Sequence, residues 1–198
     1  MSELRVASIN NPAAASGGLA ISATGAVSGA GLDHIVTETF SAASSVSVDS
    51  VFSAEYDNYR VILNLASASL TCQLRVRWSA SGTPDTSSNY WIAEHQVSGA
   101  GGHTIPVSGT SASSAHIGHY IATSSGPVDV SLNVYRPFSA TWTRHDGTGS
   151  VGIGGISDFC MIQTGSLHKV TTGYDGFQLL NLESATITGS LSVYGYKS

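Results

Sequence analysis

The sequence contains few charged residues. Lys, Arg, Asp and Glu together make up 11% of the 198 residues, less than half of the roughly 25% that is typical of globular proteins. The net charge is −5, and the eight Lys and Arg residues are scattered along the chain. We therefore expect no basic patch of the kind that binds nucleic acid. A hydrophobic content of 41% argues against disorder, which needs low hydrophobicity and high charge.

Long apolar runs and helical patterns are missing as well. No apolar run approaches the roughly 18 residues that a membrane-spanning helix needs, so we expect no membrane insertion. The first residues, MSELRVASINN, lack the basic start and apolar core of a secretory signal. No window carries apolar residues at i, i+3, i+4 and i+7 over three turns, which argues against amphipathic helices.

Only two cysteines are present, Cys72 and Cys160, and their spacing matches no CxxC metal or redox motif. Cys72 falls on the apolar side of an alternating segment, so we interpret it as a small core residue. Cys160, in DFCMI, has similar surroundings in the sequence. The sequence leaves open whether the two form a disulfide.

The sequence is instead rich in Ser (33) and Thr (17), and its apolar residues alternate with polar ones. Such alternation is typical of antiparallel strands with one buried and one wet face. Segments rich in Gly, Ser, Pro and Asp, such as 81–89 and 145–149, separate these runs as turns. The pattern predicts an all-β protein, an antiparallel, jelly-roll-like β-sandwich. The predicted core comprises Leu63, Leu65, Leu74, Val76, Val130, Leu132, Leu191 and Val193, with Leu70 on the same face as Leu74.

Residues 1–33 differ in composition from residues 34–198, which we assign to the β-sandwich domain. Short β-like pieces in the first segment are separated by Ala, Ser and Gly, and large apolar residues are too few for a core. The segment is either a flexible leader or an extended arm that becomes ordered against a partner, and the alternating apolar residues favour the arm. The predicted anchoring residues are Leu4, Val6, Ile9, Leu19 and Ile21.

No catalytic constellation stands out. Glu55 and Asp57 precede an apolar strand from Tyr59 onward, and Asp57-Asn58 is a typical turn pair. A catalytic acid needs neighbours that shift its pKa, and none stands at a defined spacing from these two. No GxSxG nucleophile elbow is present. We therefore expect no enzymatic activity and no cofactor.

Seven histidines raise the question of a metal site. His116 and His119 are three residues apart, which on a strand places their side chains on opposite faces. Glu94 and His95 likewise point to opposite faces. We expect no metal site within one chain, while a metal shared between chains at His116 or His119 stays open.

Aromatic residues at loops and strand edges are the remaining candidates for function, because they give a large contact area at low entropic cost. The candidate ligand-binding residues are Tyr90, Trp91, Tyr120 and Trp142. Tyr90 follows the polar loop 81–89 and is the residue we most expect to be exposed. For Trp91 and Trp142 we favour a place in the core.

Three landmarks in the sequence together resemble a class of tailed-bacteriophage virion proteins of the tail fibre, minor tail or receptor-binding type. They are FSAEYDNYRV at 52–61, LRVRWSASGTPD at 74–85 with SNY after it, and the closing DGFQL with ATITGSLSVYGYK. The leader SELRVASI also resembles the short N-terminal β segment of many phage fibre proteins. The resemblance implies a jelly-roll-like sandwich, often trimeric, at a fibre tip or particle surface, and it supplies no catalytic residues.

We therefore expect a non-enzymatic structural protein of a phage virion, assembled in the host cytoplasm. Its arm would bind other virion proteins, and its sandwich would form a homo-oligomer, a trimer by the resemblance, because open sheet edges favour closed assembly. The sandwich could bind a bacterial surface glycan or protein receptor, or decorate the particle. The alternative is a stand-alone carbohydrate-binding module or lectin.

Overall fold

The computed structural model describes residues 20–21, 27–28, 31–98, 104–121, 127–153 and 158–196. All regular elements in this part of the chain are β-strands. They are β1 (Ala20–Ile21), β2 (Val27–Ser28), β3 (Leu32–Ala43), β4 (Ser45–Val48), β5 (Asn58–Ala68), β6 (Cys72–Ala80), β7 (Thr83–Pro84), β8 (Tyr90–Ser98), β9 (Thr104–Ala112), β10 (Ala115–Ile121), β11 (Val128–Tyr135), β12 (Thr143–Ile153), β13 (Asp158–His168), β14 (Gly176–Asn181) and β15 (Ile187–Tyr196).

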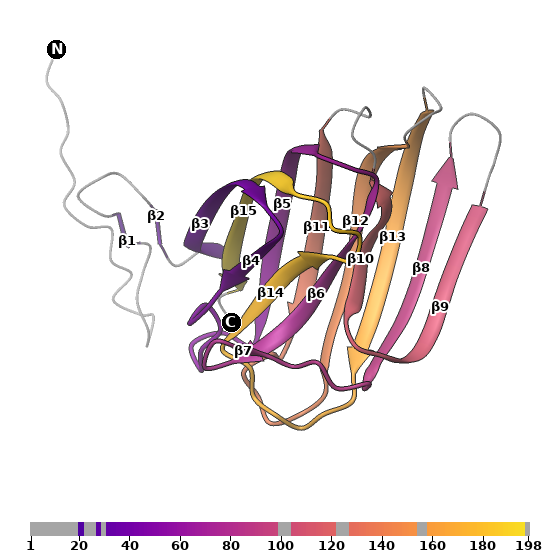
Figure 1. The fold of residues 1–198 in the computed structure, drawn as a ribbon. Helices are drawn as coiled ribbons and strands as arrows, with labels where there is room; N and C mark the ends of the chain where they lie inside the picture. The colour runs from indigo at the N-terminus through magenta and orange to yellow at the C-terminus, as the bar shows by residue number, and fades with distance from the viewer. Residues whose placement is uncertain are drawn as a thin grey trace, which may run out of the picture.

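Two antiparallel sheets pack against each other (Figure 1). The large sheet has eight strands in the order β3-β15-β5-β11-β12-β13-β8-β9. The small sheet has the order β10-β6-β14-β4, with β7 paired to β6. The chain passes repeatedly from one sheet to the other, for example from β5 to β6 and from β9 to β10. The predicted antiparallel β-sandwich is confirmed.

The core lies between the sheets, where the alternating strands place their apolar residues. All eight predicted core residues are buried, and so are both cysteines, which are free thiols. Burial raises the pKa of the Cys72 thiol to about 11. Leu70 departs from the prediction: it lies in the turn before β6 and is exposed. The strand begins only at Cys72, so Leu70 does not share its inward face.

The three landmark motifs lie side by side in the fold. Phe52 stacks on Phe177 at 5.8 Å between ring centroids and meets the edges of Tyr59 and Trp78. β15 pairs with β5 and β14 pairs with β6, so the closing motif joins both earlier ones. The Tyr56 ring covers Gly195, where an added Cβ would lie 2.5 Å from the ring. Residues of all three landmarks thus pack together within the sandwich core.

The prediction that Glu55 and Asp57 lead into a strand agrees with the structure, except that Asn58, predicted in the turn pair, already belongs to β5. Glu55 and Asp57 are exposed in the segment before β5, and β5 lies inside the large sheet between β15 and β11. The Tyr59 hydroxyl fixes this segment, because it accepts a hydrogen bond from Ser53 N (2.7 Å) and donates one to Ser53 O (2.9 Å).

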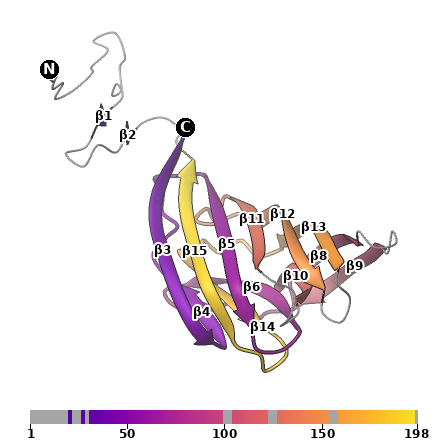
Figure 2. The same ribbon diagram turned by 90° about the horizontal axis from the view of Figure 1, so that it is seen from above.

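The large sheet begins at Leu32, close to the predicted boundary between arm and sandwich. Figure 2 shows its strands β3, β15 and β5 running alongside one another. Of the predicted anchoring residues, Leu4, Val6, Ile9 and Leu19 lie outside the described residues, and Ile21 lies in β1, which pairs with β2. Among the described residues, no helix is long and apolar enough to span a membrane.

Candidate functional site

Strand β8 reverses the usual alternation between apolar and polar residues. Tyr90, Glu94 and Gln96 face the interior, whereas Trp91 and Val97 are exposed on the outer face. The prediction that Tyr90 is exposed is wrong: its exposed fraction is 0%. Its hydroxyl accepts a hydrogen bond from Trp78 N and donates one to Asp85 O, both at 3.1 Å. Those two bonds satisfy the buried hydroxyl and tie the polar loop to β6.

Trp91 and Trp142, which we expected in the core, are instead 43% and 49% exposed. Trp91 must point outward because Tyr90, its neighbour on the strand, points inward. Trp142 lies directly before β12, outside the strand that carries inward-facing Thr143. Both tryptophans are therefore available for contact with a ligand.

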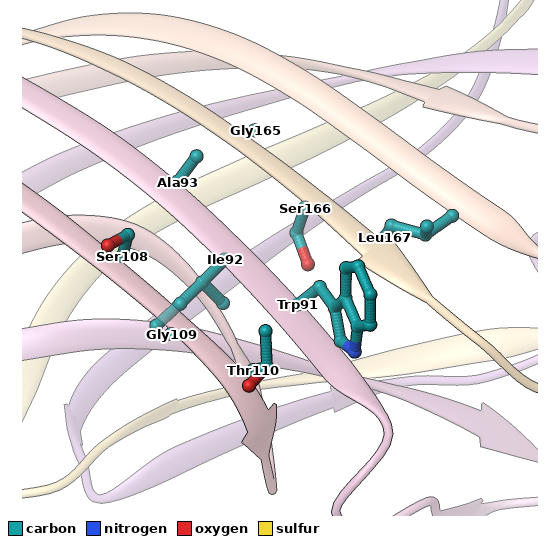
Figure 3. A pocket seen from close by; sticks show the side chains of 9 residues that line it. All are labelled: Trp91, Ile92, Ala93, Ser108, Gly109, Thr110, Gly165, Ser166 and Leu167. Atoms are coloured by element: carbon teal, nitrogen blue, oxygen red, sulfur yellow. The ribbon is translucent and has the colours of Figure 1, made fainter.

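A hollow of about 560 Å³ opens on the outer face of the large sheet beside Trp91 (Figure 3). Its floor consists of small residues on three neighbouring strands, and Trp91 and Leu167 stand together at one end as a cross-strand pair. An added Cβ at Gly165 would contact only the His145 carbonyl oxygen, at 3.8 Å. The hollow exists because these positions lack large side chains. Its lining residues are Trp91, Ile92, Ala93, Ser108, Gly109, Thr110, Gly165, Ser166 and Leu167.

A second hollow, of about 400 Å³, adjoins the first at Leu167 and is lined by Trp142, Arg136 and Arg144. The Lys169 ammonium lies 4.1 Å from the centroid of the Trp91 ring and 5.3 Å from that of Trp142. This cation–π contact places both indoles around one positive charge. The two tryptophans, 51 positions apart in sequence, therefore belong to one surface, which we call the tryptophan surface.

The interior behind β8 contains a polar cluster. The Glu94 carboxylate accepts a hydrogen bond from Gln96 Nε2 (2.7 Å) and lies 3.3 Å from His116 Nδ1 on β10. His145 Nε2 and the Thr164 hydroxyl both donate to the His116 carbonyl, at 3.2 and 2.8 Å. Burial lowers the pKa of His145 to about 4, although the hydrogen bond to the His116 carbonyl acts to raise it. These contacts join the two sheets and compensate the polar residues that β8 buries.

A further cluster holds the 81–89 loop. The Tyr174 hydroxyl donates to Asp85 Oδ2 (2.6 Å) and lies 3.1 Å from His168 Nδ1. The His168 ring stacks on Tyr90 at 4.0 Å. Burial lowers the pKa of His168, and although burial alone would raise that of Asp85, hydrogen bonds from Ser87 and Tyr174 lower it. The sequence analysis missed this cluster, because its members come from three separate segments.

Asp85, His168 and Ser87 do not form a nucleophilic triad. A triad places the carboxylate and the nucleophile on opposite nitrogens of the imidazole. Here Asp85 Oδ2 (3.6 Å) and the Ser87 hydroxyl (3.5 Å) both approach His168 Nε2. The His168 ring is also fully buried. The arrangement serves to hold the loop in place.

A Ser-x-x-Lys spacing also occurs, at Ser166 and Lys169. In enzymes with this motif the serine is the nucleophile beside the lysine. Here Ser166 Oγ has no hydrogen-bond partner among the described residues, and the Lys169 ammonium lies over the indole rings. The spacing therefore does not create a Ser–Lys pair.

The remaining predicted site residues are placed as follows. Tyr120 and His119 belong to β10, and their side chains lie outside the described part of the structure. His116 is buried beside Glu94, and His95 is exposed, so Glu94 and His95 do face opposite ways. Within the described ranges, no group of three or more His, Cys, Asp or Glu side chains could hold a metal ion.

Lys169, Leu167, Arg136 and Arg144 complete the tryptophan surface, and the sequence analysis did not single them out. The one signal in the sequence was that Lys169 directly follows an alternating run. Its contacts with Trp91 and Trp142 can be recognised only once β8, β13 and β12 are paired. Comparison of the chain with protein-family models, curated proteins and solved structures gives no match in any of the three.

Proposed function

We propose that the protein is a non-enzymatic component of a tailed-phage particle whose sandwich binds a saccharide on the host surface. One observation carries the binding part: two exposed tryptophans flank adjoining hollows on a single sheet face. Indole rings stack on the apolar faces of sugar rings, and neighbouring hydroxyls and backbone groups of the sheet can bind the sugar hydroxyls. The particle part is supported by the three landmark motifs.

A surface built on paired strands suits this role. The tryptophan surface is built on paired strands β8, β13 and β12, whose interior side is fixed by the Glu94–His116 contact. Sites on strands hold their side chains more accurately than sites on loops. Arg136, Trp142 and Lys169 come from segments that flank strands.

Saccharide binding is tested by titrating the purified protein with a panel of bacterial surface polysaccharides. Trp91→Ala and Trp142→Ala should each weaken binding tenfold or more, about 1.4 kcal/mol. Leu182→Ala is the control, because Leu182 is also an exposed apolar side chain, at 50%, and lies in the connection between β14 and β15, outside the residues that line the two hollows. Equal affinities for wild type and both tryptophan variants would remove the tryptophan surface from the proposal.

The particle part needs a separate test, because a stand-alone lectin would use the same surface. Mass spectrometry of purified phage particles should detect the protein. Deleting residues 1–31, which end directly before β3, should leave a folded sandwich that no longer incorporates into particles. Full incorporation of the shortened protein would show that the first segment does not anchor it, and absence from particles would favour the lectin.

A further inference from the structure

The tryptophan surface gathers cations in a chain that has few of them. Arg136 and Arg144 line the hollow at Trp142, and the Lys169 ammonium lies over both indoles. These are three of the eight Lys and Arg residues of the chain. Strand pairing brings the ends of β11, β12 and β13 together, so these three cations, which are far apart in the sequence, lie around one surface.

None of these three side chains forms an ion pair with an acid within the described ranges, where the close contacts of carboxylates with basic side chains are His116–Glu94 and His168–Asp85. Asp146 lies two residues beyond Arg144 on the same face of β12. Its carboxylate accepts hydrogen bonds from Asn133 (2.9 Å) and Tyr135 (2.8 Å) instead. Within those ranges, no carboxylate pairs with the three cations at the hollow.

Other arginines of the chain have protein partners. Arg77 Nε donates to Ser113 O (3.0 Å), and Arg75 donates to Gln73 (2.6 Å) with the carboxylates of Glu94 and Glu183 nearby. Arg136, by contrast, forms hydrogen bonds with other described residues through its backbone alone, whose N–H donates to Asp57 O (2.8 Å). Its φ of 52° lies in the left-handed region that favours glycine. A charged residue therefore occupies a position where glycine would be less strained.

We infer that the saccharide bound at the tryptophan surface is acidic, and that Arg136, Arg144 and Lys169 bind its carboxylate or phosphate group. Guanidinium groups match the planar geometry of such anions, and the indoles supply the stacking surface for the adjoining sugar ring. Because the whole chain carries a net charge of −5, an anionic ligand would otherwise be repelled, and a local cluster is required to attract it. This inference rests on the proposed saccharide binding.

The test compares acidic saccharides with neutral counterparts of the same backbone. The probes are polygalacturonate and alginate, each beside its carboxyl-reduced form, and polyglycerol phosphate beside neutral dextran. At least one acidic probe should bind the full-length protein tenfold or more tightly than its neutral counterpart, with affinity falling as salt rises. The carboxylate and phosphate probes separate the two sources of the charge.

Variants assign the effect to the cluster. Arg136→Gly suits φ 52° and should keep or raise the melting temperature, yet Arg136→Gly with Arg144→Gln should abolish the tenfold preference and its salt dependence. Lys169→Gln should weaken the preference for acidic probes severalfold. Arg136→Lys in place of Arg136→Gly in the double variant should restore part of that preference. Arg77→Gln, on the other sheet, is the control and should leave it unchanged.

The outcomes separate this inference from the proposed function. If neutral probes bind as tightly as acidic ones and this binding depends on Trp91, the inference is overturned and saccharide binding is kept. The same holds if the arginine variants leave the binding unchanged. Failure of every probe to bind would contradict both.

Discussion

Strands β8 and β11 lie in the same sheet, yet they distribute their residues in opposite ways. In β11 the apolar residues Val128, Val130, Leu132 and Val134 face the core, and polar residues face outward. In β8 the interior receives Glu94 and Gln96, and the outer face carries Trp91 and Val97. Both strands pair antiparallel with a neighbour on each side, although the pairing of β8 with β9 has a register shift between Tyr90 and Ile92.

This difference has an energetic meaning. An outward tryptophan forgoes burial that is worth roughly 1.5–3 kcal/mol for a large side chain, and an inward carboxylate needs partners to offset its desolvation. The chain supplies these partners through Gln96 and through His116 on β10, whose carbonyl in turn accepts a hydrogen bond from His145 on β12. A strand that departs from the usual pattern, and is compensated elsewhere, is where function is expected.

The largest expected effect comes from removing the compensation. His116→Ala leaves the Glu94 carboxylate buried without its imidazole partner at 3.3 Å, so we expect a loss of about 3–5 kcal/mol in the free energy of unfolding. Denaturant unfolding measures it. His95→Ala, at an exposed position on the same strand, should change stability by less than about 0.5 kcal/mol. A small loss for His116→Ala would mean that the pair does not stabilise the reversed strand.

Strand β11 should respond as an ordinary core strand. Leu132→Ala removes a buried side chain and should cost about 2–5 kcal/mol, measured in the same way. Val97→Ala, on the exposed face of β8, should cost less than about 1 kcal/mol, because little buried area is lost. Similar losses at the two positions would remove the contrast between the strands.

Acidification should weaken the interior behind β8. The folded pKa of His145 is about 4, below its ordinary value of 6.5, so the unfolded chain takes up the proton first as pH falls. Stability should therefore decrease from about pH 6.5 to about pH 4, with His145 contributing about 3 kcal/mol over that range. His168, whose pKa burial also lowers, acts in the same direction. His145→Gln should flatten the dependence, whereas the exposed His95→Gln should not.

The smallest expected changes in stability come from alanine substitution of two glycines on neighbouring strands, which should respond differently. At Gly147 an added Cβ would collide with the Leu132 side chain and lie 2.6 Å from Ser131 O, so Gly147→Ala should cost about 1–3 kcal/mol. At Gly165 the nearest atom is 3.8 Å away, so Gly165→Ala should change stability by less than about 0.5 kcal/mol. Thermal melting checks both.

Gly165 also offers a way to close the hollow without harming the fold. Gly165→Leu should retain the wild-type melting temperature and weaken saccharide binding, because the side chain would fill the floor of the hollow beside Trp91. Unchanged affinity in that variant would place the ligand elsewhere on the face.

The fold was predictable because period two marks each strand and its buried side. That reasoning succeeded for β5, β6, β11 and β15, where one face is clearly apolar. It failed for β8, since YWIAEHQV has aromatic and polar residues on both faces and a one-residue shift reverses every side chain. The inward side of β8 carries Glu94, whose partner His116 lies 22 positions further along the chain. No local pattern in the sequence reveals that contact.

The landmark motifs illustrate the same limit. Their aromatic residues Phe52, Tyr59, Trp78 and Phe177 pack together in the core, so the resemblance is carried mainly by residues that build the sandwich. Trp91, Trp142 and Lys169 lie outside all three motifs. The motifs therefore bear on the architecture, and the binding surface had to come from the structure.

Fluorescence of single-tryptophan variants tests the central claim, that the outer face of β8 binds the ligand, most directly. The chain has three tryptophans, and Trp78 is buried. Variants that keep one tryptophan and replace the others by Phe should show strong acrylamide quenching for Trp91 and Trp142 and weak quenching for Trp78. Adding the tightest-binding saccharide should protect Trp91 and Trp142 from the quencher. Binding that leaves both as accessible as before would contradict the account.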